Sequence, residues 1–165
     1  HRINRRQRQM CIRDSACVGD GDFHHDDTVF VTHDAVGSES RQVFKKVLRN
    51  GATGVFQGKI LVKPDAQKTD GYQISQSLLL DEDSQFLAKP ELEIYADDVA
   101  CSHGSTSGAI DEDALFYLTS RGISKPVAID MLTMAFLAEA VDEIDNDNLK
   151  DVMLELLSGW LERRR

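Results

Sequence analysis

The stretch GVFQGKILVKPDAQKTDGYQISQSLLL, residues 54–80, decides the fold class of this chain. It contains two runs rich in β-branched, aromatic and aliphatic residues, GVFQGKILVK (54–63) and YQISQSLLL (72–80). Such runs favour extended strands, because branched and aromatic side chains fit a pleated surface. Between the runs lie Pro64-Asp65 and Asp70-Gly71, which are residue pairs typical of turns. The stretch therefore predicts two strands joined by a loop.

Similar runs continue on both sides of this stretch, from Thr28 to about Thr106. They read TVFVTH (28–33), RQVFKKVL (41–48) and ELEIYA (91–96). No helical pattern interrupts them, and this excludes an alternation of strands with crossover helices. A sandwich, a barrel or a β-solenoid remains. The spacing between the runs is irregular, so the period alone does not choose among the three.

After Gly108 the spacing of apolar residues changes to that of helices. Asp111 is a suitable N-cap for a first helix, which Gly122 ends. Ser124 caps a second helix, and Asp147 begins a third. We expect the apolar stripes of the second and third helices to face the core, with part of a face left for a partner to cover. The stripes contain Val127, Met131, Met134, Leu137, Val141, Leu149, Val152, Met153, Leu156, Leu157 and Trp160.

The composition argues against several classes of function. A net charge of −9 does not suit a nucleic-acid surface, which needs clustered Lys and Arg. No apolar run approaches the roughly 18–20 residues of a membrane span. The cysteines Cys11, Cys17 and Cys101 are odd in number and widely spaced, which fits a reducing compartment and not a disulfide framework. We therefore expect a soluble, cytoplasmic protein with no nucleic-acid or membrane partner.

The first residues differ from everything that follows them. RRQRQMCIRDS (5–15) is basic and aperiodic, and it resembles translated sequencing-adapter read-through; the alternative is a basic disordered arm. Because the chain begins with His1 and not with Met, we expect a fragment. The expected division is an artefactual or disordered leader over residues 1–27, a β-segment over 28–108 and a helical domain over 109–165.

Cys101 and His103 form the candidate site. They lie in YADDVACSHGSTSG (95–108), between a strand-like run and the first helix. Residues two apart on a strand share a face, so both side chains point the same way while Ser102 points away. A thiol and an imidazole make a soft ligand set suited to iron or zinc. Two ligands do not close a tetrahedral site, and nothing nearby in the sequence completes it.

Other interpretations of these residues stay open. Cys101 and His103 suit a nucleophile–base pair, although such a pair also needs an orienting group and an oxyanion hole. A buried cysteine beside an ordinary histidine is the simplest interpretation. His24 and His25 are adjacent and so face opposite sides of a strand, and His33 is separated from Cys101 by several strands. For residues 22–34 we expect mostly a solvated loop.

Long stretches of the chain resemble the SufB/SufD family of iron–sulfur cluster assembly proteins. The resemblance covers roughly residues 28–144 and rests on AQKTDGYQ (66–73), LEIYADDV (92–99), CSHG (101–104) and DALFYLTSRGI (113–123). It implies a right-handed parallel β-helix, truncated at its N-terminal end and followed by a small α-helical C-terminal domain. In the SufB branch a cysteine stands at the position of Leu118 and the Cys-x-His pattern is absent, so the chain is SufD-like.

The resemblance also implies a role and partners. Members of this branch pair with a SufB-like subunit through the β-helix and with a SufC-like ATPase through the C-terminal helices, here about residues 111–165. Cys101 and His103 match family residues at the SufB–SufD interface, where they would hold iron or a nascent iron–sulfur cluster transiently with the partner's ligands. The chain would be a scaffold subunit with no catalytic residue. The alternative is a stand-alone metal-binding or thiol-dependent enzyme that uses Cys101 and His103.

Overall fold

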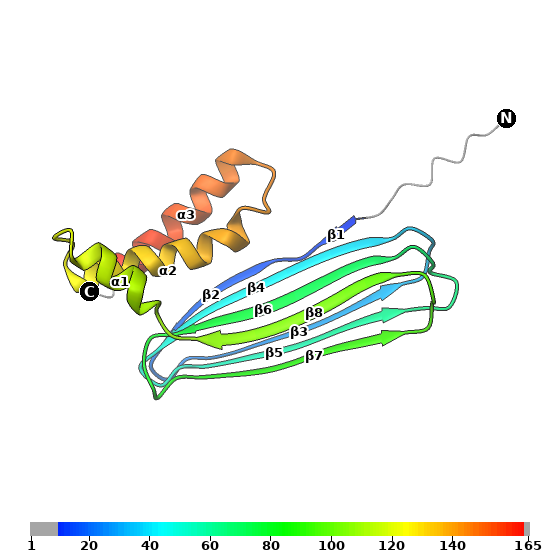
Figure 1. Ribbon diagram of the computed structural model, residues 1–165, viewed down its shortest axis with the longest axis horizontal. Helices are drawn as coiled ribbons and strands as arrows, with labels where there is room; N and C mark the ends of the chain where they lie inside the picture. Colours follow the sequence, from blue (N-terminus) through cyan, green and yellow to red (C-terminus); the bar gives the residue numbers. More distant parts are fainter. Residues whose placement is uncertain (1–9, 164–165) are drawn as a thin grey trace.

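The computed structural model describes residues 10–163 and shows, within that range, eight strands followed by three helices (Figure 1). The strands are β1 (Met10–Ile12), β2 (Ser15–Asp20), β3 (His24–His33), β4 (Glu39–Arg49), β5 (Thr53–Val62), β6 (Asp70–Leu79), β7 (Gln85–Ile94) and β8 (Ala100–Gly108). The helices are α1 (Glu112–Thr119), α2 (Lys125–Val141) and α3 (Asp147–Glu162).

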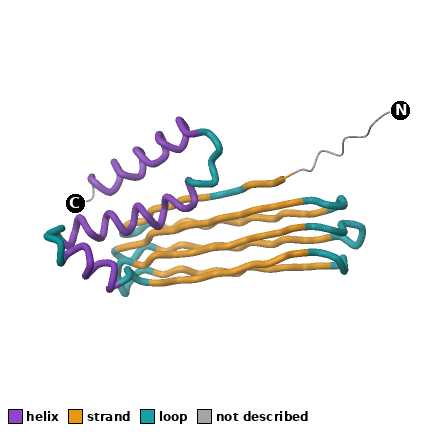
Figure 2. The backbone as a smooth tube through the Cα atoms, turned by 45° about the horizontal axis from the view of Figure 1, so that its top comes forward, coloured by secondary structure: helices purple, strands orange, loops and turns teal. Residues whose placement is uncertain are grey.

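The strands form two parallel sheets that the chain visits in turn. One sheet has the order β1–β4–β6–β8, with β2 also paired to β4, and the other has the order β3–β5–β7. Every strand pair within residues 10–163 is parallel. Each circuit of the chain therefore adds one strand to each sheet, which makes a β-solenoid of about three turns (Figure 2). The prediction of a mainly β parallel helix with a helical end is confirmed.

The β-structure begins before Thr28, which differs from the boundary expected from the sequence. β2 pairs with β4 over six residues, from Ser15 opposite Phe44 to Asp20 opposite Arg49. The strand expected over residues 28–33 is present but begins earlier, because β3 covers residues 24–33, with Val29 and His33 buried. The solvated loop that was expected over residues 22–34 is therefore wrong. The polar residues of this segment are compatible with a strand, because alternate residues of β3 face the solvent. Of the segment that resembles adapter read-through, residues 5–9 lie outside the described residues.

Alternating side chains of both sheets meet inside the solenoid. The ring centroids of Phe44 on β4 and Phe56 on β5 lie 4.7 Å apart, and Val29 packs beside them. Ile60 and Val62 form a second apolar cluster with Ala66 and Ala96. Apolar burial of this kind stabilises the fold by about 25 cal/mol per Å² of surface removed from water.

The corners of the solenoid use the turn residues that the sequence indicates. Asn50 and Gly51 have positive φ angles of 56° and 83°, in the left-handed region that asparagine and glycine tolerate best. The Asp81 carboxylate, one turn later, accepts hydrogen bonds from the backbone N–H groups of Asn50 and Ser84. The corner of one turn is thus tied to the corner of the next.

The helix α2 covers the outer face of β4 (Figure 1). Leu137 is fully buried and packs against Val47 of β4 and Leu78 of β6. Charged contacts flank this apolar centre, because Lys45 pairs with Glu139 and Arg41 Nε lies 2.9 Å from a carboxylate oxygen of Glu143. β4 is consequently covered on both faces.

The three helices begin where the sequence predicts, but more of the apolar stripe of the third helix is exposed than was expected. Asp111 and Asn146 accept backbone N–H bonds at the starts of α1 and α3. Of the large apolar residues of α3, Leu154, Leu157 and Trp160 are half-buried and Leu161 is buried. The exposed apolar residues of the two stripes are Met131 of α2 and Leu149, Val152, Met153 and Leu156 of α3. The pattern gives the apolar face but does not say whether another element covers it. No helix within residues 10–163 is long and apolar enough to cross a membrane.

A buried lysine holds a polar cluster inside the first described turn. Lys46 is 1% exposed, and its Nζ lies 2.7 Å from Asp27 Oδ2 and 2.8 Å from His25 Nδ1. The Cys17 thiol is nearby, and burial raises its pKa, with Lys46 acting in the opposite direction. Because an ammonium without a partner is costly to bury, the carboxylate of Asp27 is what allows Lys46 to occupy this position.

We predict that Lys46→Ala destabilises the chain by about 3–5 kcal/mol, because it leaves the partly buried Asp27 carboxylate without its partner. Urea unfolding of the full chain, followed by circular dichroism, measures the change. Lys63→Ala is the matched control: its pair with Asp34 is 49% and 64% exposed, and losing such a pair costs about 0–1 kcal/mol. Equal losses in the two variants would contradict the prediction.

Candidate functional site

The candidate residues lie on β8, the last strand of its sheet. β8 pairs with β6 on one side, and no other strand within residues 10–163 pairs with its second edge. β7 ends the other sheet in the same way. Both strands therefore present backbone N–H and C=O groups that a further strand can pair with. The chain leaves β8 directly into α1 (Figure 1).

Cys101 and His103 both face the interior side of β8. Their register partners on β6 are Gly71 and Gln73, whereas Ser102 lies opposite the outward-facing Tyr72. Cys101 is partly buried against the apolar cluster of Ile60 and Val62. His103 is exposed. The two side chains thus share a face at the open edge.

The thiol of Cys101 is held in its protonated form. Burial raises its pKa, the Gly71 backbone hydrogen bond acts in the opposite direction, and the nearby Asp70 carboxylate raises it further. Gly71 makes space for the sulfur, because a Cβ at that position would lie 3.2 Å from Cys101 Sγ. A cation that binds the sulfur must therefore displace the thiol proton.

The other histidines do not join Cys101 and His103. His33 is buried, burial lowers its pKa, and its Nε2 lies 2.9 Å from Ser40 Oγ. His25 belongs to the Lys46 cluster, and the exposed His24 faces the opposite side of β3. Over residues 10–163 no group of three or more His, Cys, Asp or Glu side chains could hold a metal ion. Cys101 and His103 remain two ligands of an incomplete set.

Sequence reasoning missed a row of polar side chains behind the candidate residues. Gln42 on β4 and Gln73 on β6 lie in register with His103, and both are fully buried. Farther along, Ser75 and Ser77 donate to Ser105 and Ser107 of β8. The signal was the offset between strands of one sheet, which is 31 residues from Gln42 to Gln73 and 30 from Ser75 to Ser105.

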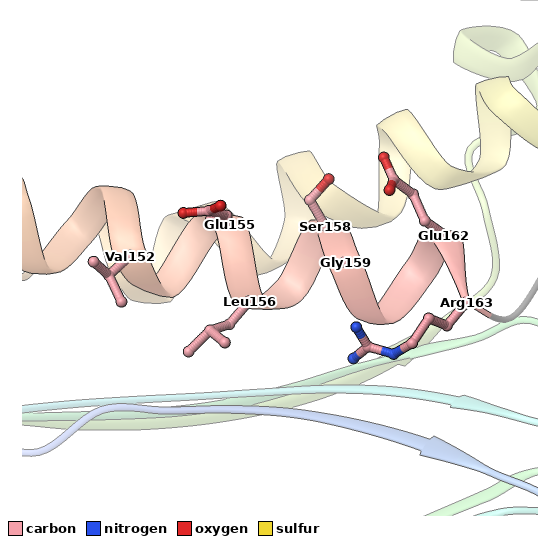
Figure 3. Close-up of a pocket in the computed structure, with 7 residues that line it drawn as sticks. All are labelled: Val152, Glu155, Leu156, Ser158, Gly159, Glu162 and Arg163. Carbon is pink, nitrogen blue, oxygen red and sulfur yellow. The ribbon is translucent and has the colours of Figure 1, made fainter.

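A second surface lies on α3, away from β8. A shallow pocket there is lined by Val152, Glu155, Leu156, Ser158, Gly159, Glu162 and Arg163. Figure 3 shows Leu156 and Arg163 pointing to one side of the helix, and Glu155, Ser158 and Glu162 to the other. The exposed Leu149, Val152, Met153 and Leu156 give this helix an apolar surface.

Comparison with known proteins identifies the family. Residues 6–136 match the SufBD core domain of SUF system FeS cluster assembly. The chain is 40% identical over 129 residues to the iron–sulfur cluster assembly protein SufD of Escherichia coli, covering 78% of this chain and 30% of that protein. It is 37% identical over 119 residues to an iron–sulfur cluster assembly SufBD family protein of Synechocystis, covering 72% of this chain and 26% of that one.

A SufD protein of Bacillus subtilis is 31% identical over 140 residues, covering 85% of this chain and 32% of the relative. The chain thus spans less than a third of the length of these curated relatives. The observed solenoid, followed by three helices, agrees with the match to the SufBD core domain. The chain belongs to the SufB/SufD family of iron–sulfur cluster assembly proteins and is SufD-like.

Proposed function

We propose that this chain is a SufD-like scaffold subunit in iron–sulfur cluster assembly, working with a SufB-like subunit and a SufC-like ATPase. The observation that carries the proposal is the incomplete ligand set on an edge strand. Cys101 and His103 share the interior face of β8, whose outer edge has no strand partner within residues 10–163. A site divided between two subunits leaves such a half on each of them.

The half-site suits iron or a nascent cluster as cargo. Thiolate and imidazole are both common ligands of iron. The cargo takes the Cys101 sulfur as thiolate, so the thiol proton leaves when the cargo binds, and the raised pKa of the free thiol keeps the empty site protonated. The partner supplies the remaining ligands, and neither subunit then holds the cluster tightly alone.

The SufB-like partner meets this chain at the open end of the solenoid. Edge strands bind a further strand through main-chain hydrogen bonds, a mode that recurs in protein recognition. β7 carries Lys89 and Pro90, residues that blunt an edge, whereas β8 carries neither Lys nor Pro. In the proposal, β8 is therefore the strand that the partner approaches.

The SufC-like ATPase binds the helical part, within residues 111–165. Leu149, Val152, Met153 and Leu156 on α3 give it an apolar face at helical spacing. α2 joins this helical part to β4, and β4 joins through β6 to β8. Movement of the helices on ATP hydrolysis by the partner can thus reach the shared site through packed elements.

We predict that Leu156→Asp weakens retention of a SufC-like ATPase at least about 10-fold, because it places a charge in the apolar face of α3. Co-purification of the full chain with the ATPase measures this, with circular dichroism to show that the fold is kept. Val36→Asp, at an exposed apolar residue in the loop before β4, is the control. Retention of the ATPase by Leu156→Asp at the level of the control would contradict the assignment of α3.

In a complex of this chain with SufB-like and SufC-like subunits, Cys101→Ala and His103→Ala are each expected to lower the iron retained after anaerobic loading. The reason is that each removes one ligand of the shared site. Ser102→Ala lies between them but faces outward, so it should leave the iron content unchanged. Full iron content in both ligand variants would rule out the half-site.

The alternative of a thiol-dependent enzyme makes the opposite prediction for the Cys101 thiol. A nucleophilic thiol needs a depressed pKa, but burial raises that of Cys101. We predict that alkylation of Cys101 by iodoacetamide has its pH midpoint above that of a thiol in a short peptide, about 8.5. Peptide mass spectrometry resolves Cys101 from Cys11 and Cys17. A midpoint below the peptide value would favour the enzyme.

A further inference from the structure

A row of three polar side chains crosses one sheet and ends at His103. Gln42 on β4, Gln73 on β6 and His103 on β8 are register partners on the same interior face. Neighbouring strands lie about 4.8 Å apart, so each side chain in such a row stacks on the next. Gln73 is therefore the side chain directly behind His103.

Among the described residues, the side-chain amide of Gln73 forms a hydrogen bond through its nitrogen but not through its oxygen. Its Nε2 donates to Gln42 Oε1 at 3.0 Å, while its own Oε1 has no hydrogen-bond partner among the described residues. Gln73 is fully buried. Burying a carbonyl oxygen without a hydrogen-bond partner is unfavourable, so a donor that reaches this oxygen stabilises the structure.

The space around this oxygen is provided by a glycine on the opposite sheet. A Cβ at Gly58 of β5 would lie 2.5 Å from Gln73 Oε1, which no real side chain permits. Gly58 thus lets the glutamine extend fully across the interior. Because the nitrogen of the amide is engaged by Gln42, the oxygen is the atom that remains for the third member of the row.

We propose that Gln73 is a positioning residue for His103: its Oε1 accepts a hydrogen bond from one ring N–H of His103 and leaves the other ring nitrogen free to bind iron. The bond forms when the exposed ring of His103 turns toward Gln73. A neutral imidazole has one donor and one acceptor nitrogen, so the bond selects the tautomer. Only the binding of iron by the free nitrogen rests on the proposed function; the hydrogen bond does not.

A metal-binding histidine usually donates its second ring N–H to a fixed acceptor, and loss of that acceptor typically costs 10–100-fold in metal affinity. Two such acceptors are common in proteins, a carboxylate and a backbone carbonyl. Here the acceptor is a side-chain amide that is itself fixed by Gln42. Through the two amides, the position of His103 depends on Gln42 of β4, the strand covered by α2.

The hydrogen bond is tested by the tautomer of His103 in the full chain. Long-range ¹H–¹⁵N NMR at pH 8, with signals assigned through His103→Gln, is expected to show one tautomer in excess. Gln73→Met removes the acceptor at similar length and should shift the tautomer ratio, whereas Gln73→Glu keeps an acceptor oxygen and should preserve it. Gln76→Met, on the outer face of the same strand, is the control. An unchanged ratio in Gln73→Met overturns the inference.

Iron affinity in the complex with the SufB-like and SufC-like subunits tests the positioning role. Gln73→Met is expected to lower the iron affinity by about 10–100-fold, whereas Gln73→Glu is expected to keep it close to that of the unsubstituted chain. A changed tautomer with unchanged affinity overturns positioning. If His103→Ala itself leaves the affinity unchanged, the proposed function fails, and the tautomer measurement still decides whether the hydrogen bond exists.

Discussion

The strand β4 is covered on both of its faces, and the rest of the molecule is arranged around that constraint. Its inner side chains pack against β5, where Phe44 meets Phe56. Its outer side chains pack against α2, where Val47 meets Leu137. It also pairs with β1, β2 and β6 along its edges. Because β4 has this many neighbours, it fixes both the register of its sheet and the position of the helices.

The local elements could be predicted from the sequence because their signals are local. The runs at residues 54–63 and 72–80 correspond closely to β5 and β6, and Asp111 caps α1 as expected. The start of β7 was missed, since Lys89 and Pro90 are poor strand formers and only ELEIYA shows alternation. The choice of a solenoid was out of reach from spacing alone, because consecutive strands belong to different sheets.

The candidate site could likewise be predicted only in part. That Cys101 and His103 share a face follows from two-residue alternation and needs no tertiary information. That Gln73 lies behind His103 depends on register between strands about 30 residues apart, which propensity does not reveal. Exposure of the α3 stripe was likewise hidden, because periodicity marks an apolar face without showing what covers it.

The packing of α2 on β4 also sets an order for folding during synthesis. Lys45 and its partner Glu139 are 94 residues apart, so the outer face of β4 is made long before the helix that covers it. At about 5–20 residues per second, a ribosome needs roughly 5–20 s to produce the intervening segment. Throughout that interval Val47 lacks the cover of Leu137 on α2. Apolar surface exposed in this way is prone to aggregation, and the arrival of α2 ends the exposure.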